Sequence, residues 1–203
     1  MISGHSKPGG VQRATVKDLD MVVEVLVDSH VDYVWERWAL PWGDRGQRLE
    51  GLYMSMLRWL SLPAGEVWMS RCGQSAAVWL PAGADQDRGP EAIAQLETAT
   101  VAAFGDRLQI IGEIDEIIAT QRPPADWILA TMGTSPMAQG RGLGTEVLKP
   151  RLAALDADGA RAVLETSDRR NLGFYERLGF VVVAELDELP HDAPTTWIME
   201  RTT

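Results

Sequence analysis

The sequence has little cysteine and no long apolar run, and each shortage excludes a class of protein. Its single cysteine, Cys72, excludes an internal disulfide and fits a reducing compartment, so we expect a cytoplasmic protein. Its longest apolar stretches are short and interrupted, for example by Glu24, so none is long enough to span a bilayer. We therefore expect no membrane partner.

Basic residues are also scarce, because 19 Lys plus Arg stand against 29 Asp plus Glu, which gives a formal net charge of −10. The longest basic patch is the DRR at 168–170, so binding to nucleic acid has little electrostatic support. An acidic surface field favours a cationic small molecule or peptide, although solubility alone explains the charge as well. We expect no nucleic-acid partner.

Helix-like and strand-like segments alternate along the chain, without an internal repeat. After a strand at 11–16, apolar residues recur at helical spacing within 17–38, at Leu19, Val22, Val23, Leu26 and Val27. Further helices are predicted at 48–60, 90–104, 106–120, 142–157 (with a kink or end at Pro150) and 171–179. Further strands are predicted at 66–80 (a hairpin turning at 72–73), 126–134, 160–166, 180–186 and 195–201. The pattern predicts one mixed α/β domain over residues 11–203, behind a flexible leader of residues 1–10.

Three glycines, Gly140, Gly142 and Gly144, lie between the predicted buried strand at 126–134 and a predicted helix. Glycines allow close approach or positive φ, and the first N–H groups of a helix lack intrahelical partners, so this stretch can bind phosphate. Arg141 would add a charge there, or lie solvated at the surface. A turn of small residues explains the glycines equally well. The P-loop motif G-x-x-x-x-G-K-[ST] and the dinucleotide motif G-x-G-x-x-G are not matched.

The stretch does match the pattern Q-x-x-G-x-G/A, with Gln139, Gly142 and Gly144 at the fixed positions. With this motif the sequence resembles the GNAT superfamily of acetyl-CoA-dependent N-acetyltransferases, in which the motif binds pyrophosphate. The likeness runs from Trp127 to Arg201, through WILATMGTSP, QGRGLGTEVLKP, LETSDRRNLGFYERLGF and TTWIMER. Within these, NLGFYERLGF is far more specific than the glycine motif, and the likeness is strongest to members that acetylate puromycin.

The resemblance implies a GNAT fold, a mixed and mostly antiparallel sheet flanked by helices, with two strands splayed to admit acetyl-CoA. It implies an acyltransferase that uses acetyl-CoA as cosubstrate and no metal, as a monomer or homodimer. The expected acceptor is the primary amine of a small molecule, first puromycin or a related aminonucleoside antibiotic, acetylated directly in a ternary complex as resistance or detoxification. Two alternatives stay open: a protein or peptide N-acetyltransferase, and a non-catalytic acyl-CoA-binding module.

The resemblance also implies roles for single residues. Backbone groups of Met132 and Thr134 would pair with the pantetheine arm, and residues 139–145 would cradle the pyrophosphate. Tyr175 would donate a proton to the leaving sulfur. The expected donor-binding residues are Met132, Gly133, Thr134, Gln139, Gly140, Arg141, Gly142, Leu143, Gly144, Thr145 and Asn171.

No general base stands out, although an ammonium acceptor must lose a proton before it attacks. Glu165 alternates with Leu164 on its strand and is predicted as a general base or as an electrostatic partner of the ammonium. A plain salt bridge is the alternative for Glu165. His30 has a suitable intrinsic pKa but is interpreted as a helix-surface histidine. From the residues alone, Tyr175 could equally be a core tyrosine and Asn171 a helix cap.

Aromatic residues crowd the end of the first predicted helix, at Tyr33, Trp35 and Trp38. The resemblance implies that the acceptor enters there, and an aromatic wall suits a flat cationic substrate through stacking and cation–π contact. These three are the expected substrate-binding residues. Packing between helices explains them equally well.

Overall fold

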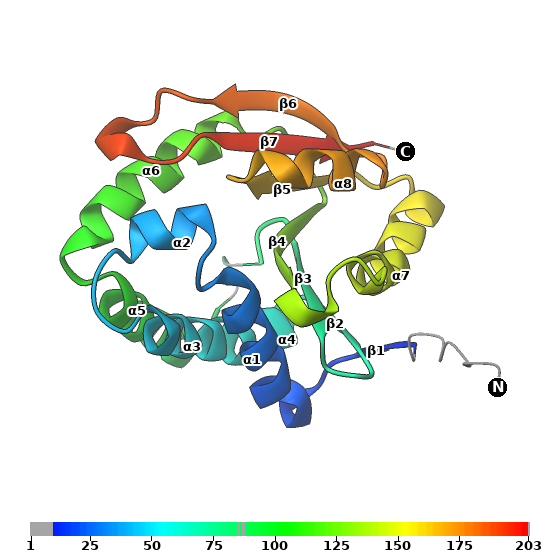
Figure 1. Ribbon diagram of the computed structural model, residues 1–203, viewed down its shortest axis with the longest axis horizontal. Helices are drawn as coiled ribbons and strands as arrows, with labels where there is room; N and C mark the ends of the chain where they lie inside the picture. Colours follow the sequence, from blue (N-terminus) through cyan, green and yellow to red (C-terminus); the bar gives the residue numbers. More distant parts are fainter. Residues whose placement is uncertain (1–9, 85, 87, 203) are drawn as a thin grey trace.

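The computed structural model describes residues 10–84, 86 and 88–202. Of the leader predicted at 1–10, residues 1–9 lie outside the described residues and Gly10 is exposed. The strands are β1 (Val11–Arg13), β2 (Glu66–Ser70), β3 (Ser75–Pro81), β4 (Trp127–Thr134), β5 (Ala162–Thr166), β6 (Val181–Leu186) and β7 (Thr196–Arg201). In the described chain they form one sheet of order β1-β2-β3-β4-β5-β7-β6, in which only β4 and β5 pair in parallel. The predicted mixed, mostly antiparallel sheet is confirmed (Figure 1).

The α-helices flank this sheet on both faces (Figure 1). They are α1 (Leu19–His30), α2 (Val34–Ala39), α3 (Arg45–Met56), α4 (Leu62–Ala64), α5 (Pro90–Phe104), α6 (Leu108–Gln121), α7 (Leu143–Asp158) and α8 (Leu172–Glu176). None of them, within the described chain, is long and apolar enough to cross a membrane. The helix α7 continues through Pro150, so the predicted helix end at that proline is wrong.

The single helix predicted at 17–38 is broken into α1 and α2, because Tyr33 takes an extended backbone conformation with φ −66° and ψ 146°. The break reverses the chain at the end of α1 and carries α2 to a separate position beside α6 and β7 (Figure 1). As a result, residues 17–38 do not form one continuous helix. They are divided between α1 and α2, with a space between the two helices.

The sheet separates two apolar clusters, and β3 contributes to both because successive side chains of a strand point to opposite faces. Ala76 and Val78 pack with α1 and α3, whereas Ala77 and Trp79 pack with α7. The predicted apolar stripe of α1 is buried in the first cluster, apart from the partly buried Val27. The two clusters hold the sheet rigidly in the region where the strands open.

The strands β4 and β5 pair only over Trp127–Leu129 and Ala162–Leu164 and then diverge. At the point of divergence the register between β3 and β4 shifts, so that Ala130 has no partner and forms a bulge. The predicted splay is therefore confirmed. The expectation that 126–134 is a buried strand is wrong for its second half, because residues 131–134 pair with β3 on one side but border the opening on the side of β5.

Candidate functional site

A cleft of about 1110 Å³ occupies the opening between β4 and β5. It extends from the start of α7 to the space between α2, α3 and α6. The predicted site residues that line it are Tyr33, Trp35, Met132, Gly133, Thr134, Gln139, Gly140, Gly142, Leu143, Gly144, Thr145, Glu165, Asn171 and Tyr175. Arg141 and Trp38 are outside its lining. Most of the predicted site is thus brought together in one place.

The glycine stretch forms one end of the cleft. Gly140 and Gly142 have φ of +75° and +81°, which side chains rarely adopt, and the positions where their Cβ atoms would lie are open. Gly142 is also the N-cap residue of α7, so no side chain covers the free N–H groups of the first helical turn. A ring of uncapped backbone donors at the positive end of a sixteen-residue helix suits a phosphate group. Arg141 is exposed beside this ring.

The strand β4 meets α7 and α1 at close range. A Cβ atom on Gly144 would lie 3.2 Å from Met132 Cε and 3.3 Å from Thr134 Oγ1, and one on Gly133 would collide with Ser29. The Gln139 side chain donates to the Thr134 carbonyl oxygen at 3.3 Å. Gln139 therefore holds the glycine stretch against the open edge of β4. The Thr134 carbonyl oxygen already accepts this hydrogen bond.

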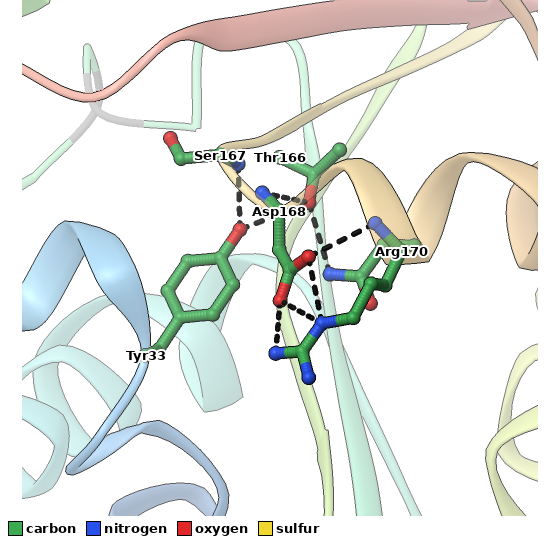
Figure 2. A network of polar contacts seen from close by, with 6 residues as sticks. Tyr33, Thr166, Ser167, Asp168 and Arg170 are labelled. Carbon is green, nitrogen blue, oxygen red and sulfur yellow. Dashed lines mark hydrogen bonds and ion pairs between the residues drawn. The ribbon is translucent and has the colours of Figure 1, made fainter.

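A polar network closes the cleft at the end of β5. The Tyr33 hydroxyl accepts a hydrogen bond from the Ser167 backbone N–H at 2.6 Å and lies 2.9 Å from Thr166 Oγ1. Asn171 Nδ2 donates to the same threonine oxygen at 3.0 Å and makes no helix-capping bond, so its side chain does not cap α8. Figure 2 shows Tyr33 reaching from the chain before α2 to the end of β5. The network fixes the turn between α1 and α2 across the opening.

Tyr175 is buried and lines the cleft. Its ring packs edge-on against Phe174 and Phe180, with centroids 5.1 Å and 6.0 Å away. Burial raises the pKa of the Tyr175 phenol, and the neighbouring Tyr33 raises it further. The hydroxyl therefore keeps its proton at neutral pH, as a proton donor requires, while its ring serves the core. The predicted acid role stays a prediction.

Glu165 faces the cleft opposite Leu164 in the β-strand alternation and is held by a salt bridge. Its Oε1 accepts from Arg122 Nε at 2.8 Å and lies 2.6 Å from Nη2. Nearby on α6, burial and the charge of Glu165 raise the pKa of Asp115 to about 6, while Arg122 lowers it. The salt bridge that the sequence left as an alternative is present, within a group of acids at this end of the cleft.

The sequence interpretation did not single out Glu36, a half-buried residue of α2 that lines the cleft. Its Oε2 atom is buried and has no hydrogen-bond partner among the described residues. Burial raises the pKa of Glu36 to about 8, against lowering by its own backbone N–H, the Arg45 charge and the Tyr53 hydroxyl. A lone acid between Trp35 and Trp38 on an apolar helix was the signal that could have indicated it.

His30 lies in the cleft, so its interpretation as a helix-surface residue is wrong. Its Nδ1 lies 2.8 Å from the Leu26 carbonyl oxygen, which can only accept, so this nitrogen carries a proton. Burial lowers the pKa of His30. Its ring lies 5.8 Å from the rings of Tyr33 and Tyr53. Tyr53, on α3, was also missed; its hydroxyl bonds to Thr131 and Glu36, and burial raises its pKa.

The two predicted tryptophans have different surroundings. Trp35 lines the cleft, with its ring 5.0 Å from that of Trp38. Trp38 instead donates from Nε1 to the His191 carbonyl oxygen at 3.0 Å and lies 4.8 Å under the Arg107 guanidinium. Packing against the chain before β7 therefore explains Trp38, whereas Trp35 and Tyr33 form the aromatic side of the cleft.

Residues 97–182 match the family model described as an acetyltransferase (GNAT) domain. They include the open half of β4, the glycine stretch, Glu165 and Tyr175. GNAT acetyltransferases are acyltransferases that use acetyl-CoA, so the prediction of an acyltransferase is confirmed for this domain. The match to this family model does not test the likeness to members that acetylate puromycin.

Solved structures of acetyltransferases share the fold over nearly the whole chain. One, from Corynebacterium glutamicum, is described as histone acetyltransferase HPA2 and related acetyltransferase; it is 24% identical, with 95% of each chain covered and a TM-score of 0.67. Arylalkylamine N-acetyltransferase 2 from Aedes aegypti is 15% identical, over 95% of this chain and 97% of that one, with a TM-score of 0.60. The ribosomal-protein-S18-alanine N-acetyltransferase from Escherichia coli is 16% identical, over 95% and 92%, with a TM-score of 0.54. At these identities the likeness is one of fold, and it confirms the predicted GNAT architecture.

Proposed function

We propose that the protein transfers the acetyl group of acetyl-CoA to the primary amine of a small molecule, with puromycin or a related aminonucleoside antibiotic as the first candidate. The observation that carries this proposal is the cleft itself. One end offers uncapped backbone N–H groups to an anion, and the other offers aromatic rings and carboxylates to a cation. An anionic acyl donor and a cationic acceptor fit these opposite ends.

The residues at the donor end fit acetyl-CoA, which supplies the activated thioester. Residues 130–134 of β4 have no strand beside them on the side of β5, so their backbone is free to bind an extended pantetheine arm. The first turn of α7 would hold the pyrophosphate through its N–H groups. Asn171 lines the cleft between these parts and the end of β5.

The acceptor end favours a small molecule over a protein chain. The bond from Ser167 to Tyr33 joins the turn before α2 to the end of β5 and closes the cleft on that side. An extended peptide would need an open groove there. Tyr33 and Trp35 offer faces to a flat group, and Glu36, Asp115 and Glu165 offer charge to an ammonium. A nucleoside that carries an aryl amino acid combines these features.

Tyr175 has the chemistry of a proton donor for the departing sulfur. A thiolate that leaves must take up a proton, and a buried phenol with a raised pKa is still protonated when that happens. We further propose that residues 11–203 act as one domain, since all strands of the described chain belong to one sheet with β1 and β6 at its edges. The expected setting is the cytoplasm, as a monomer or homodimer, consistent with the free, exposed Cys72.

Thiol release from acetyl-CoA tests the proposal. We would add puromycin, then aminoglycosides, other aminoacyl nucleosides, polyamines and peptides with free amino termini, and identify the acetylated product by mass spectrometry. Saturable turnover with puromycin or another small amine is the expected result. Turnover with peptides alone would replace the proposal by a peptide acetyltransferase. Binding of acetyl-CoA without turnover on any amine would favour a non-catalytic module.

A further inference from the structure

Glu36 is the one carboxyl group that lines the cleft and also has a buried oxygen without a hydrogen-bond partner in the described chain. A buried acceptor without a partner costs free energy, on the order of 1–3 kcal/mol. Such a group in a cleft is expected to have a use that appears only when a ligand is bound. An amine donates N–H groups and is the ligand expected at this end.

No side chain in the described part of the protein supplies a hydrogen bond to this buried oxygen. Arg45, the nearby cation, already donates to the carbonyl oxygens of Val31 and Leu40 at 2.7 Å and 3.0 Å and lies 3.7 Å from Asp32. It lowers the pKa of Glu36 without supplying a hydrogen bond to the free oxygen. The carboxyl group therefore has a cation nearby that leaves one of its oxygens without a partner in the described chain.

Glu36 also lies close to where the acetyl group must be transferred. The Tyr53 hydroxyl bonds to both Glu36 and Thr131, and Thr131 directly precedes Met132 on the open edge of β4. Beyond the effect of burial, the charge of Glu36 raises the pKa of Tyr33, and Tyr33 raises the pKa of Tyr175, so Tyr33 is near both residues.

We propose that Glu36 is the catalytic residue that takes the proton from the acceptor ammonium. The proposal rests on the proposed function. One proton passes from the ammonium nitrogen to the Glu36 carboxylate, which frees the nitrogen lone pair. That pair forms the bond to the acetyl carbon as the carbon–sulfur bond breaks, and the sulfur leaves with the bonding electrons. The second proton lost by the nitrogen balances the one taken up by the thiolate.

The other titratable groups of the cleft are less suited to this step. Burial lowers the pKa of His30, which makes its imidazole a weaker base than a solvated one. Glu165 is held by two bonds from Arg122. Asp115 lies on α6 beside that pair, and Tyr33 and Tyr53 keep their protons because burial raises their pKa values. Glu36 remains as the acid that lines the cleft and has an oxygen without a partner in the described chain.

The protonation of Glu36 sets the pH at which it can act. Burial raises its pKa to about 8, so the carboxylate form that accepts a proton is populated as pH rises toward 8.

The test compares Glu36→Gln with Glu97→Gln, a matched change on the exposed face of α5 outside the cleft. For Glu36→Gln we expect kcat/KM for the best amine to fall by about 100-fold at pH 7.5, because a positioned base contributes roughly 10²–10⁴-fold. Acetyl-CoA affinity should stay within about twofold. The limb of the pH–rate profile that rises toward pH 8 should disappear. Glu97→Gln should leave kcat/KM, affinity and profile unchanged.

A Glu36→Asp variant provides a second check, because it keeps the carboxylate but moves it back by one methylene. Partial recovery of turnover in Glu36→Asp, with the rising limb restored, supports a base. A Glu36→Gln variant that keeps turnover within threefold and the same pH profile overturns the role of Glu36 alone. Wild-type protein without turnover on any amine overturns the proposed function and this role with it, so the two failures are distinct.

Discussion

At the donor end of the cleft the chain offers mainly backbone groups, whereas at the acceptor end it offers side chains from several separate elements. The donor end is made by one continuous stretch, from β4 through the glycines into α7, and its conformation depends on Gly140 and Gly142. The acceptor end combines Glu36 from α2 and Tyr53 from α3 with Asp115 from α6. The donor site therefore depends on local backbone geometry, whereas the acceptor site depends on tertiary packing.

The largest expected effect is at Tyr175, where the two ends meet. Tyr175→Phe removes only the hydroxyl and keeps the ring contacts with Phe174 and Phe180. Turnover should fall by about 100-fold or more, because a positioned acid contributes roughly 10²–10⁴-fold, while acetyl-CoA binding stays nearly intact. Steady-state kinetics together with calorimetric binding of CoA measure both. Equal turnover at several pH values would remove Tyr175 from the chemistry.

A smaller effect is expected in the stability of the acceptor end as pH changes. The folded pKa of Glu36, about 8, lies above its ordinary value of 4.5, so the folded state binds a proton more tightly than the unfolded state. The free energy of unfolding should therefore fall as pH rises from about 4.5 to about 8. Glu36→Gln lacks this loss, so its advantage over wild type should grow across that range, by at most about 5 kcal/mol.

Urea unfolding of wild type and Glu36→Gln at matched pH values measures this difference. Comparison with the variant is needed because Asp115, whose pKa is also raised, lowers stability in the same direction between about pH 4 and 6. His30, whose pKa is lowered by burial, acts below about pH 6.5 and in the opposite direction. A difference between the two proteins that does not change with pH would contradict the raised pKa of Glu36.

The donor end is expected to respond to a change in backbone conformation. Gly142→Ala places a side chain at φ +81°, which costs about 1 kcal/mol or slightly more. The positions around it are open, so the cost is one of conformation and not of collision. The affinity for acetyl-CoA should fall several-fold, with kcat for the bound complex little changed. An unaltered Kd, measured by calorimetry, would mean that the glycine conformation does not matter for donor binding.

The smallest effect is expected at Arg141. The sequence predicts that this arginine contacts phosphate, but its side chain is exposed and outside the cleft lining. Arg141→Ala should therefore raise the KM for acetyl-CoA by less than about threefold, since an exposed charge contributes little in water. A tenfold rise would show that the side chain moves onto the donor when it binds.

The sequence predicts the donor end of the cleft better than the acceptor end. The glycine stretch, the splayed strands and the position of Tyr175 depend on short, continuous motifs, and all of them lie in the cleft as expected. The acceptor end could not be assembled in this way. The extended backbone at Tyr33 breaks the expected long helix, and this break brings α2 into the cleft wall.

Burial explains the remaining differences. His30 is a plausible surface residue on a helical pattern, but α3 covers it with Tyr53, and its pKa falls. Glu36 is an ordinary surface acid by composition, and its pKa rises only because α3 and the β4 edge surround it. Such pKa shifts arise when distant parts of the chain pack together, so no short sequence motif predicts them.

We expect the acceptor end to serve the primary amine of a small molecule and not a peptide. The most direct measurement is a competition, in which the protein acts on acetyl-CoA with puromycin and an amino-terminal peptide at equal concentration, and mass spectrometry follows both acceptors. We expect the acetyl group to accumulate on the amine nitrogen of the small molecule while the peptide stays unmodified. Acetylation of the peptide first would contradict this expectation.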